Sequence, residues 1–326
     1  MYFYLFLLFG ATLFFIFAVF ISNYRNKIKV NIEVVDKYKD IAYRLIKDNS
    51  KLDEERKKYR TRKLISTIFI VSFFSLFFLA SRIDFRLYFV FLIALIIYVL
   101  YLILCNRKTS FYDEIISNII HEYKSDLNYD HYQGINSSIY REARFEGYDR
   151  YHSEDLMEGT INGQDFVMSE VHTERRHTDD DGHTSYTTIF HGAFAKVSLK
   201  KDFKCFVNIC NNKIKLFNKD TYTTIDNEAF EKIYDVFTDD KIKAMRLLTP
   251  DVTSNIIDLY NETGIYCEVK IINNILYIRL YTGALFTFSF SNPEKEAELV
   301  GRSLAIIDSV FRIMENFIGE IERFDI

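Results

Sequence analysis

The pattern of hydrophobic and polar positions divides the chain into three long apolar runs and a polar remainder. The runs are Tyr2–Ser22, Leu64–Ala80 and Leu87–Cys105, and a short charged link joins the last two. A helix needs about 20 apolar residues to cross a bilayer, and each run comes close to that length. The first run has no basic segment before it and no cleavage pattern after it, so we interpret it as a retained span rather than a signal peptide. The pattern therefore predicts three transmembrane helices, of which the last two form a hairpin.

The basic residues beside these runs predict their orientation. Residues 23–63 carry 14 Lys and Arg against 7 Asp and Glu, whereas the link in the hairpin holds only Arg82 and Arg86. Because loops rich in Lys and Arg stay in the cytoplasm, we expect an N-terminus outside the cell and a cytoplasmic C-terminal region. Residues 106–326 carry 25 basic against 37 acidic side chains, and this acidic balance argues against nucleic acid as a partner.

Apolar residues at helical spacing occur on both sides of the predicted hairpin. One stripe runs from Val34 to Leu45 and a second from Tyr112 to Tyr123, so we expect two amphipathic helices that pair with each other. The first is followed by a basic run, Arg56–Lys63. Such a run is typical of the charge that sets membrane topology, and the alternative is a coiled-coil arm or a contact with anionic lipid.

From about Asp130 the pattern changes to short apolar runs separated by Asn and Gly, which predicts β-hairpins. The strongest turn signal is Asn162-Gly163, because a two-residue turn needs positive φ at both positions. Asn211-Asn212 and Asn273-Asn274 are weaker signals of the same kind, and residues 187–199 form a further predicted strand.

Three helices are predicted in the second half of the chain. The first covers about 240–248, the second runs from the Thr249 cap to Gly264, and the last covers about 292–324. The apolar stripe of the last helix is too wide for a two-stranded coiled coil, so we expect it to dock across its own sheet, with dimerisation as the alternative. The order of elements predicts an α+β domain with an antiparallel sheet capped by helices.

The predicted organisation has five segments. They are a first transmembrane helix at 1–22, a cytoplasmic amphipathic helix or loop at 23–63, a transmembrane hairpin at 64–105, a juxtamembrane helix at 106–130, and a cytoplasmic α+β domain at 131–326. The four cysteines form no Cys-x-x-Cys pair, so we expect reduced, buried thiols rather than a disulfide framework or a zinc site.

Several short motifs follow one another from Tyr151 onward. They are Ser153-Glu154-Asp155-Leu156 with Gly159, then Ile161, Gly163 and Phe166, then Ser169-Glu170-Val171, then Phe190-His191-Gly192-Ala193-Phe194, then Asp239, Asp240 and Ala244 before Leu247-Leu248-Thr249-Pro250. In this order they resemble the bacterial membrane-associated family of unknown function DUF3137, over about residues 30–326. The resemblance implies a bacterial cell membrane location and no known activity. It therefore assigns no catalytic or cofactor-binding residue.

A segment rich in histidine and acidic residues, from His172 through His177 to His183 with His191 beyond it, is the main candidate for chemistry. Imidazoles and carboxylates at this density are the ligands of divalent transition metals. However, the spacing matches no zinc pattern, and the segment lies between two predicted strands. We therefore expect a solvated hairpin tip, with metal binding by His172, His177 and His183 as a weak alternative.

Glu154-Asp155 and Glu170 are carboxylates of the type that hydrolytic enzymes pair, but the sequence does not fix their separation. No nucleophile elbow, phosphate-binding loop or dinucleotide fingerprint occurs in the chain. We therefore expect a membrane-anchored protein with a non-catalytic interaction or scaffold domain. Its expected partners are the lipid bilayer and either another protein or a second copy. The alternative is a metal-dependent or hydrolytic enzyme that uses residues 172–191.

Overall fold

The computed structural model describes residues 32–80, 93, 96–98, 111–179, 181–212, 222–287 and 292–323. The helices within these ranges are α2 (Ile32–Lys47), α3 (Ser50–Ala80), α5 (Phe111–Tyr123), α6 (Ser137–Glu142), α7 (Glu228–Glu231), α8 (Lys241–Leu247), α9 (Pro250–Thr263) and α10 (Pro293–Arg323). The strands are β1 (Asn128–Asp130), β2 (Arg150–Ile161), β3 (Gln164–Thr178), β4 (Thr184–Ser198), β5 (Val207–Asn211), β6 (Tyr222–Thr223), β7 (Tyr234–Thr238), β8 (Cys267–Ile272) and β9 (Ile275–Leu280).

The described strands form one antiparallel sheet in the order β1-β2-β3-β4-β9-β8-β5-β7-β6. Asn162 and Gly163, with φ of 48° and 72°, make the predicted tight turn between β2 and β3. Asn273, with φ of 55°, begins the corresponding turn between β8 and β9. Both hairpin predictions are confirmed. The strand predicted after Asn211-Asn212 lies outside the described residues.

The ends of α9 follow the predicted capping residues, and side chains cap two other helices. The Thr249 side chain accepts a hydrogen bond from Val252 N at the start of α9, and Gly264 ends that helix in the left-handed region with φ of 70°. The Asp240 side chain caps α8 in the same way through Lys243 N. The Asn292 side chain accepts from Lys295 N at the start of α10.

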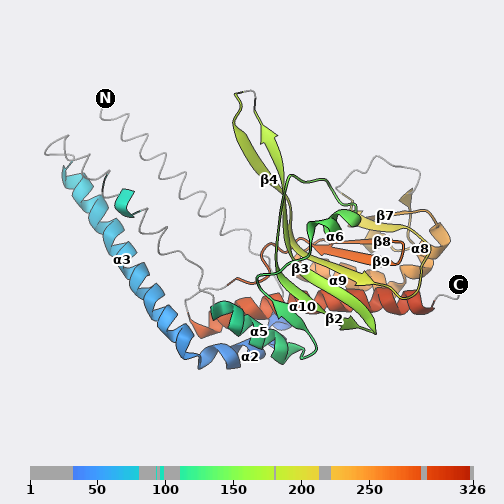
Figure 1. The fold of residues 1–326 in the computed structure, drawn as a ribbon, viewed down its shortest axis with the longest axis horizontal. Coiled ribbons are helices and arrows are strands. Elements are labelled where there is room, and N and C mark those ends of the chain that lie inside the picture. Colours follow the sequence, from blue (N-terminus) through green and yellow to red (C-terminus); the bar gives the residue numbers. More distant parts are fainter. Residues whose placement is uncertain are drawn as a thin grey trace.

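The two faces of the sheet cover two separate cores. Ala193 and Ala195 of β4 belong to the larger core, which α10, α2 and α5 complete, whereas Phe194 between them belongs to the smaller core with Tyr140 of α6. In Figure 1, α10 runs along the sheet on the side where α2 and α5 also lie, and α3 extends away from the domain. The alternation along β4 is the period-two pattern of a sheet buried on both faces.

The last helix docks as predicted. Phe311 of α10 is buried, and its ring lies edge-on to Phe166 of β3 with ring centres 5.3 Å apart. The predicted pairing of the two amphipathic helices is also confirmed, because Tyr38 of α2 contacts Tyr123 of α5 with ring centres 5.8 Å apart. The Tyr123 hydroxyl donates to Asp308 of α10 at 2.9 Å, so these two helices join the same core as α10.

The predicted membrane part of three transmembrane helices is wrong as a description of this fold. Within the part of the chain that the structure describes, no helix has the length and apolar character needed to cross a membrane. α3 has 31 residues, but its first half is highly charged, and its apolar run Leu64–Ala80 has only 17 residues against the about 20 of a typical span. Residues 1–22 and most of 87–105 lie outside the described residues.

Candidate functional site

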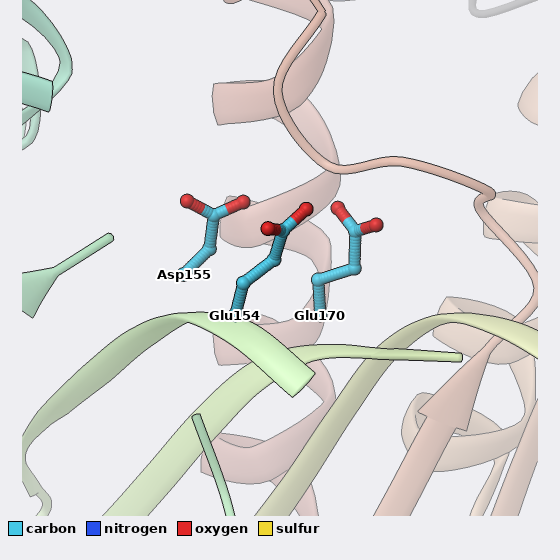
Figure 2. A group of neighbouring side chains, drawn as sticks. All are labelled: Glu154, Asp155 and Glu170. Atoms are coloured by element: carbon cyan, nitrogen blue, oxygen red, sulfur yellow. The ribbon is translucent and has the colours of Figure 1, made fainter. Parts of the chain in front are cut away.

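Three carboxylates meet where β2 and β3 lie side by side. Glu154 stands directly opposite Glu170 in the ladder, and the register then shifts between Glu154 and Met157, so that Asp155 joins them. One oxygen of each carboxylate lies within 4.8 Å of one oxygen of each of the others, and Figure 2 shows the three side chains pointing to the same side of the strands. Because like charges opposite each other destabilise a sheet, this cluster needs compensating groups. We call Glu154, Asp155 and Glu170 the carboxylate cluster.

Glu170 receives compensation from two elements. His191 Nε2 of β4 lies 2.7 Å from Glu170 Oε1, and Leu285 N, in the connection between β9 and α10, donates to Oε2 at 2.6 Å. His172 stacks on His191 with ring centres 4.5 Å apart, and its Nε2 lies 2.9 Å from Thr188 Oγ1. Burial, followed by the neighbouring His191, lowers the pKa of His172.

Asp155 is held by groups from β1 and from the loop that follows it. Its Oδ1 accepts from the Tyr129 hydroxyl and lies beside His131 Nδ1, both at 2.6 Å. Burial raises the pKa of Asp155, and these two hydrogen bonds offset only part of that effect. Burial alone lowers the pKa of His131, but the hydrogen bond and charge of Asp155, with the charge of Asp113, raise it overall. The backbone of Asp155 has φ of 60°, an unusual conformation for a non-glycine residue.

The arrangement has two possible chemical uses. Mg²⁺ and Ca²⁺ bind carboxylate oxygens in proteins. Side chains that hydrogen-bond to such carboxylates, as His131 and Tyr129 do here, commonly hold them in position. The two carboxyls of a glycosidase are about 6.5–9.5 Å apart in inverting enzymes and about 5–5.5 Å apart in retaining ones, so the spacing of the carboxylate cluster excludes only the inverting arrangement. Imidazoles and a main-chain N–H already contact Asp155 and Glu170, which leaves these two carboxylates engaged within the fold.

The structure separates the three histidines singled out in the sequence. His172 lies within β3 beside the carboxylate cluster, rather than in the expected polar turn. His177 and His183 lie at the far end of the β3–β4 hairpin, where the His183 side chain is 82% exposed. The sequence analysis missed His131 as a site residue, because it lies in a loop 24 positions before Asp155 and no local pattern links the two.

A second buried charge network lies on β8 and β9, at the smaller core. Arg279 and Glu268 are almost fully buried and hydrogen-bonded to each other, and Glu146 lies 2.6 Å from Arg279 Nη1. The Phe145 ring covers the guanidinium at 4.0 Å. Burial lowers the pKa of the neighbouring Lys270 to about 8, and the charge of Arg279 acts in the same direction. Arg279 is paired with both Glu268 and Glu146, and Lys270 Nζ donates to Arg144 O at 2.6 Å, so this network ties β8 and β9 to the segment after α6.

We expect His191 to matter for stability and His183 not to. Glu170 is only 5% exposed, so His191→Ala leaves its carboxylate without a side-chain partner and should cost about 1–3 kcal/mol of the free energy of unfolding. His183→Ala, on the same hairpin but exposed, should change it by less than about 0.5 kcal/mol. Chemical denaturation of the two variants measures both values. Equal effects would show that the His191–Glu170 contact does not stabilise the fold.

We expect His131 to make stability depend on pH. Because its folded pKa is raised above the unfolded value of about 6.5, its stabilisation is fully present below that pH and is lost as pH rises through the folded pKa. The pKa of Asp155 is also raised in the folded state, so its contribution to stability likewise falls as pH rises, beginning at a lower pH. The stability difference between the wild type and His131→Gln should therefore shrink as pH rises above about 6.5. A difference that stays constant or grows would contradict the assignment.

The fold is an α+β protein with a helix-covered antiparallel sheet, and one family model matches part of it. Residues 188–318 match the model of a family described as protein of unknown function (DUF3137). This match supports the family resemblance over that part of the chain. The matched part includes His191 and most of α10, but neither Glu154 nor Glu170. It covers less than half of the chain and does not test membrane character or bacterial origin.

No curated protein matches this chain. Among solved structures, the chain is similar to the mycobacterial trehalose monomycolate transport factor A, TtfA, with 9% sequence identity. The similarity covers 58% of this chain and 89% of that one, with a TM-score of 0.32. This score is too low to support an argument about fold or function.

Proposed function

We propose that this chain is a bilayer-associated interaction module, in which α3 contacts lipid and the α+β domain binds other molecules without catalysing a reaction. The observation that carries the proposal is the surface of α3. Leu64, Ile65, Ile68 and Ile70 are between 43% and 61% exposed, and they follow one another within two turns. Tyr98 stacks on Phe69 beside this surface, with ring centres 4.3 Å apart. An apolar surface of this kind is disfavoured in water and favoured in an apolar phase.

The basic side chains next to this apolar surface support anionic lipid as what α3 contacts. The basic side chains of the preceding turns are all exposed; they are Lys57, Lys58, Arg60, Arg62 and Lys63. A basic segment directly beside an apolar one fits an interface in which headgroups are anionic and the layer beyond them is apolar. Arg56 does not belong to this set, because it is buried against Glu296.

The joint between α3 and the domain supports a fixed attachment. Arg56 of α3 makes a buried ion pair with Glu296 of α10, with Arg56 Nη2 2.7 Å from Glu296 Oε2. The same nitrogen donates to Ile46 O at 3.1 Å, which ties the end of α2 to the joint. A helix held at its base in this way would present the domain at a set position relative to the surface that α3 contacts.

The partners of the carboxylate cluster support a non-catalytic domain. Glu170 is engaged by His191 and by Leu285 N, and Asp155 is engaged by Tyr129 and His131. These contacts join β1, β2, β3, β4 and two connecting segments, which is the pattern of a network that stabilises a fold. Catalytic groups instead need a proton or an oxygen directed at a substrate.

A fluorescent label tests the lipid contact directly. We would replace the four native cysteines with serine, introduce either Ile68→Cys on α3 or Ile242→Cys on α8, and label the full chain in vesicles that contain phosphatidylserine and a spin-labelled quencher lipid. Ile242 is a matched control because it is also an exposed isoleucine on a helix, at 67%. We expect quenching of the label at 68 and not at 242. Equal quenching at both positions would overturn the proposal. It would also be overturned if the label at 68 were not quenched because a second copy of the chain covers it.

A further inference from the structure

The hairpin of β3 and β4 extends beyond the rest of the sheet. β2 covers the outer edge of β3 only as far as the pair Arg150 and Glu174, and β9 covers β4 only from the pair of Ala193 and Leu280 onward. Beyond these pairs, Gly283 N donates to His191 O at 3.0 Å on the β4 side, and Arg176 N donates to Asp149 Oδ2 at 2.7 Å on the β3 side. The Arg150 guanidinium also lies over the Tyr186 ring, 3.3 Å from its centre. Residues 175–178 and 184–189 therefore form a two-stranded arm, which Figure 1 shows standing out from the sheet.

The two outer edges of this arm differ in charge. The β4 edge has the sequence Thr184, Ser185, Tyr186, Thr187, Thr188 and Ile189, with no charged residue and no proline. The β3 edge instead carries Arg175, Arg176 and His177, all exposed. Exposed strand edges pair readily with other strands, and proteins usually block them with charge, proline or a covering element. The structure describes no strand along the β4 edge between 184 and 190.

We propose that the β4 edge of the arm pairs antiparallel with the same edge of a second copy of this chain. A twofold axis through such a pair brings each residue opposite a residue of the same strand in the partner. Like charges opposite each other destabilise a pair of strands. The β4 edge presents none, whereas pairing of β3 edges would place arginines together. The β4 edge can therefore lie opposite itself without like charges, so the charge pattern favours this edge over the β3 edge for pairing between two copies.

The expected product is a four-stranded sheet in the order β3-β4 followed by β4-β3 of the partner. β-branched and aromatic residues favour extended strands, and the edge holds Thr, Tyr and Ile at five of its six positions from 184 to 189. The strands are short, so the contact is smaller than the about 1,200–2,000 Å² of a stable interface. The dimer is therefore weak and depends on concentration. This inference does not rest on the lipid contact of α3.

Two variants with the same added charge test the pairing. Ser185→Lys/Thr187→Lys places two charges on the β4 edge, and the control His177→Lys/Thr178→Lys places two on the β3 strand of the same arm. His177 pairs with Ser185 across the arm, and Thr178 lies opposite Thr184, so the control adds its charges at the same end of the arm. All four residues are exposed, so we expect both variants to fold. In sedimentation velocity of the full chain, the first variant should dimerise at least about tenfold more weakly than the wild type, and the control should match the wild type.

Cysteine cross-linking separates this contact from association elsewhere on the chain. Under mild oxidation, Thr187→Cys should form a disulfide-linked dimer, whereas His177→Cys should not. A wild type that stays monomeric at all accessible concentrations would overturn the proposal. Equal dimerisation by the two lysine variants, or equal cross-linking at 187 and 177, would overturn it as well.

Discussion

Glu296→Leu should destabilise the fold by about 3–5 kcal/mol, because it leaves the buried Arg56 guanidinium without its main partner. Arg56 is 2% exposed and Glu296 is fully buried. Arg56 Nε contacts both carboxylate oxygens of Glu296 at 3.2 Å, and Arg56 Nη2 contacts one of them at 2.7 Å. Burial raises the pKa of Glu296, and the hydrogen bond and charge of Arg56 offset part of that rise. Chemical denaturation of the full chain measures the loss.

The control for this prediction lies two residues further along α10. Glu298 is partly exposed and pairs with Arg302 one turn away, so Glu298→Leu should cost no more than about 1 kcal/mol. The double variant Arg56→Met/Glu296→Leu removes both charges and should recover much of the lost stability. If Glu296→Leu melts like the wild type, the ion pair does not hold α3 to the domain.

Phe311→Ala should also cost about 3–5 kcal/mol, because it opens a cavity where α10 meets the sheet. The Phe311 ring lies edge-on to Phe166, and Lys124 Nζ covers it at 4.6 Å from the ring centre. A loss of this size is a large part of the stability of an ordinary domain. Thermal unfolding of Phe311→Ala measures the effect, and Arg312→Ala, at an exposed neighbouring position, is the control.

The outcome for Phe311 also decides between docking and dimerisation. A variant that keeps the wild-type melting temperature but changes from dimer to monomer would make α10 an interface. A large loss of stability with an unchanged oligomeric state is the result that the packing against Phe166 predicts.

Local signals in the sequence predicted local structure well. The turn at Asn162-Gly163, the cap at Thr249 and the stop at Gly264 are each fixed by the conformational preferences of one or two residues. The wide apolar stripe of α10 likewise predicted its docking, because a stripe of that width needs a broad partner surface. Short elements such as β1 and β6, with three and two residues, carry too little pattern to be predicted.

Sequence patterns did not predict the contacts between residues that lie far apart in the chain. Arg56 and Glu296 are 240 positions apart, and the basic run that contains Arg56 gave no sign that one member is buried. Glu154, Asp155 and Glu170 were recognised as carboxylates, but only the register of β2 and β3 brings them within 4.8 Å. His131 reaches them through the loop after β1, which no periodicity describes.

The apolar runs show how hydropathy alone can mislead. The run from Leu64 predicted a helix that starts there, whereas α3 starts at Ser50 and includes the basic turns before the run. Helix boundaries follow backbone capping and packing, and the Arg56 joint fixes this helix well before its apolar part. The orientation and cellular location that were drawn from the flanking charges stay predictions.

A spin-label scan along α3 measures whether its apolar surface enters lipid. Single labels would be placed from Lys57 to Ile70 in the full chain bound to anionic vesicles, and their accessibility to oxygen and to a polar nickel chelate compared. We expect high nickel accessibility up to Lys63 and high oxygen accessibility from Leu64 onward, because the exposed basic side chains end where the exposed apolar ones begin. Nickel accessibility that stays high throughout Leu64–Ile70 would contradict this expectation.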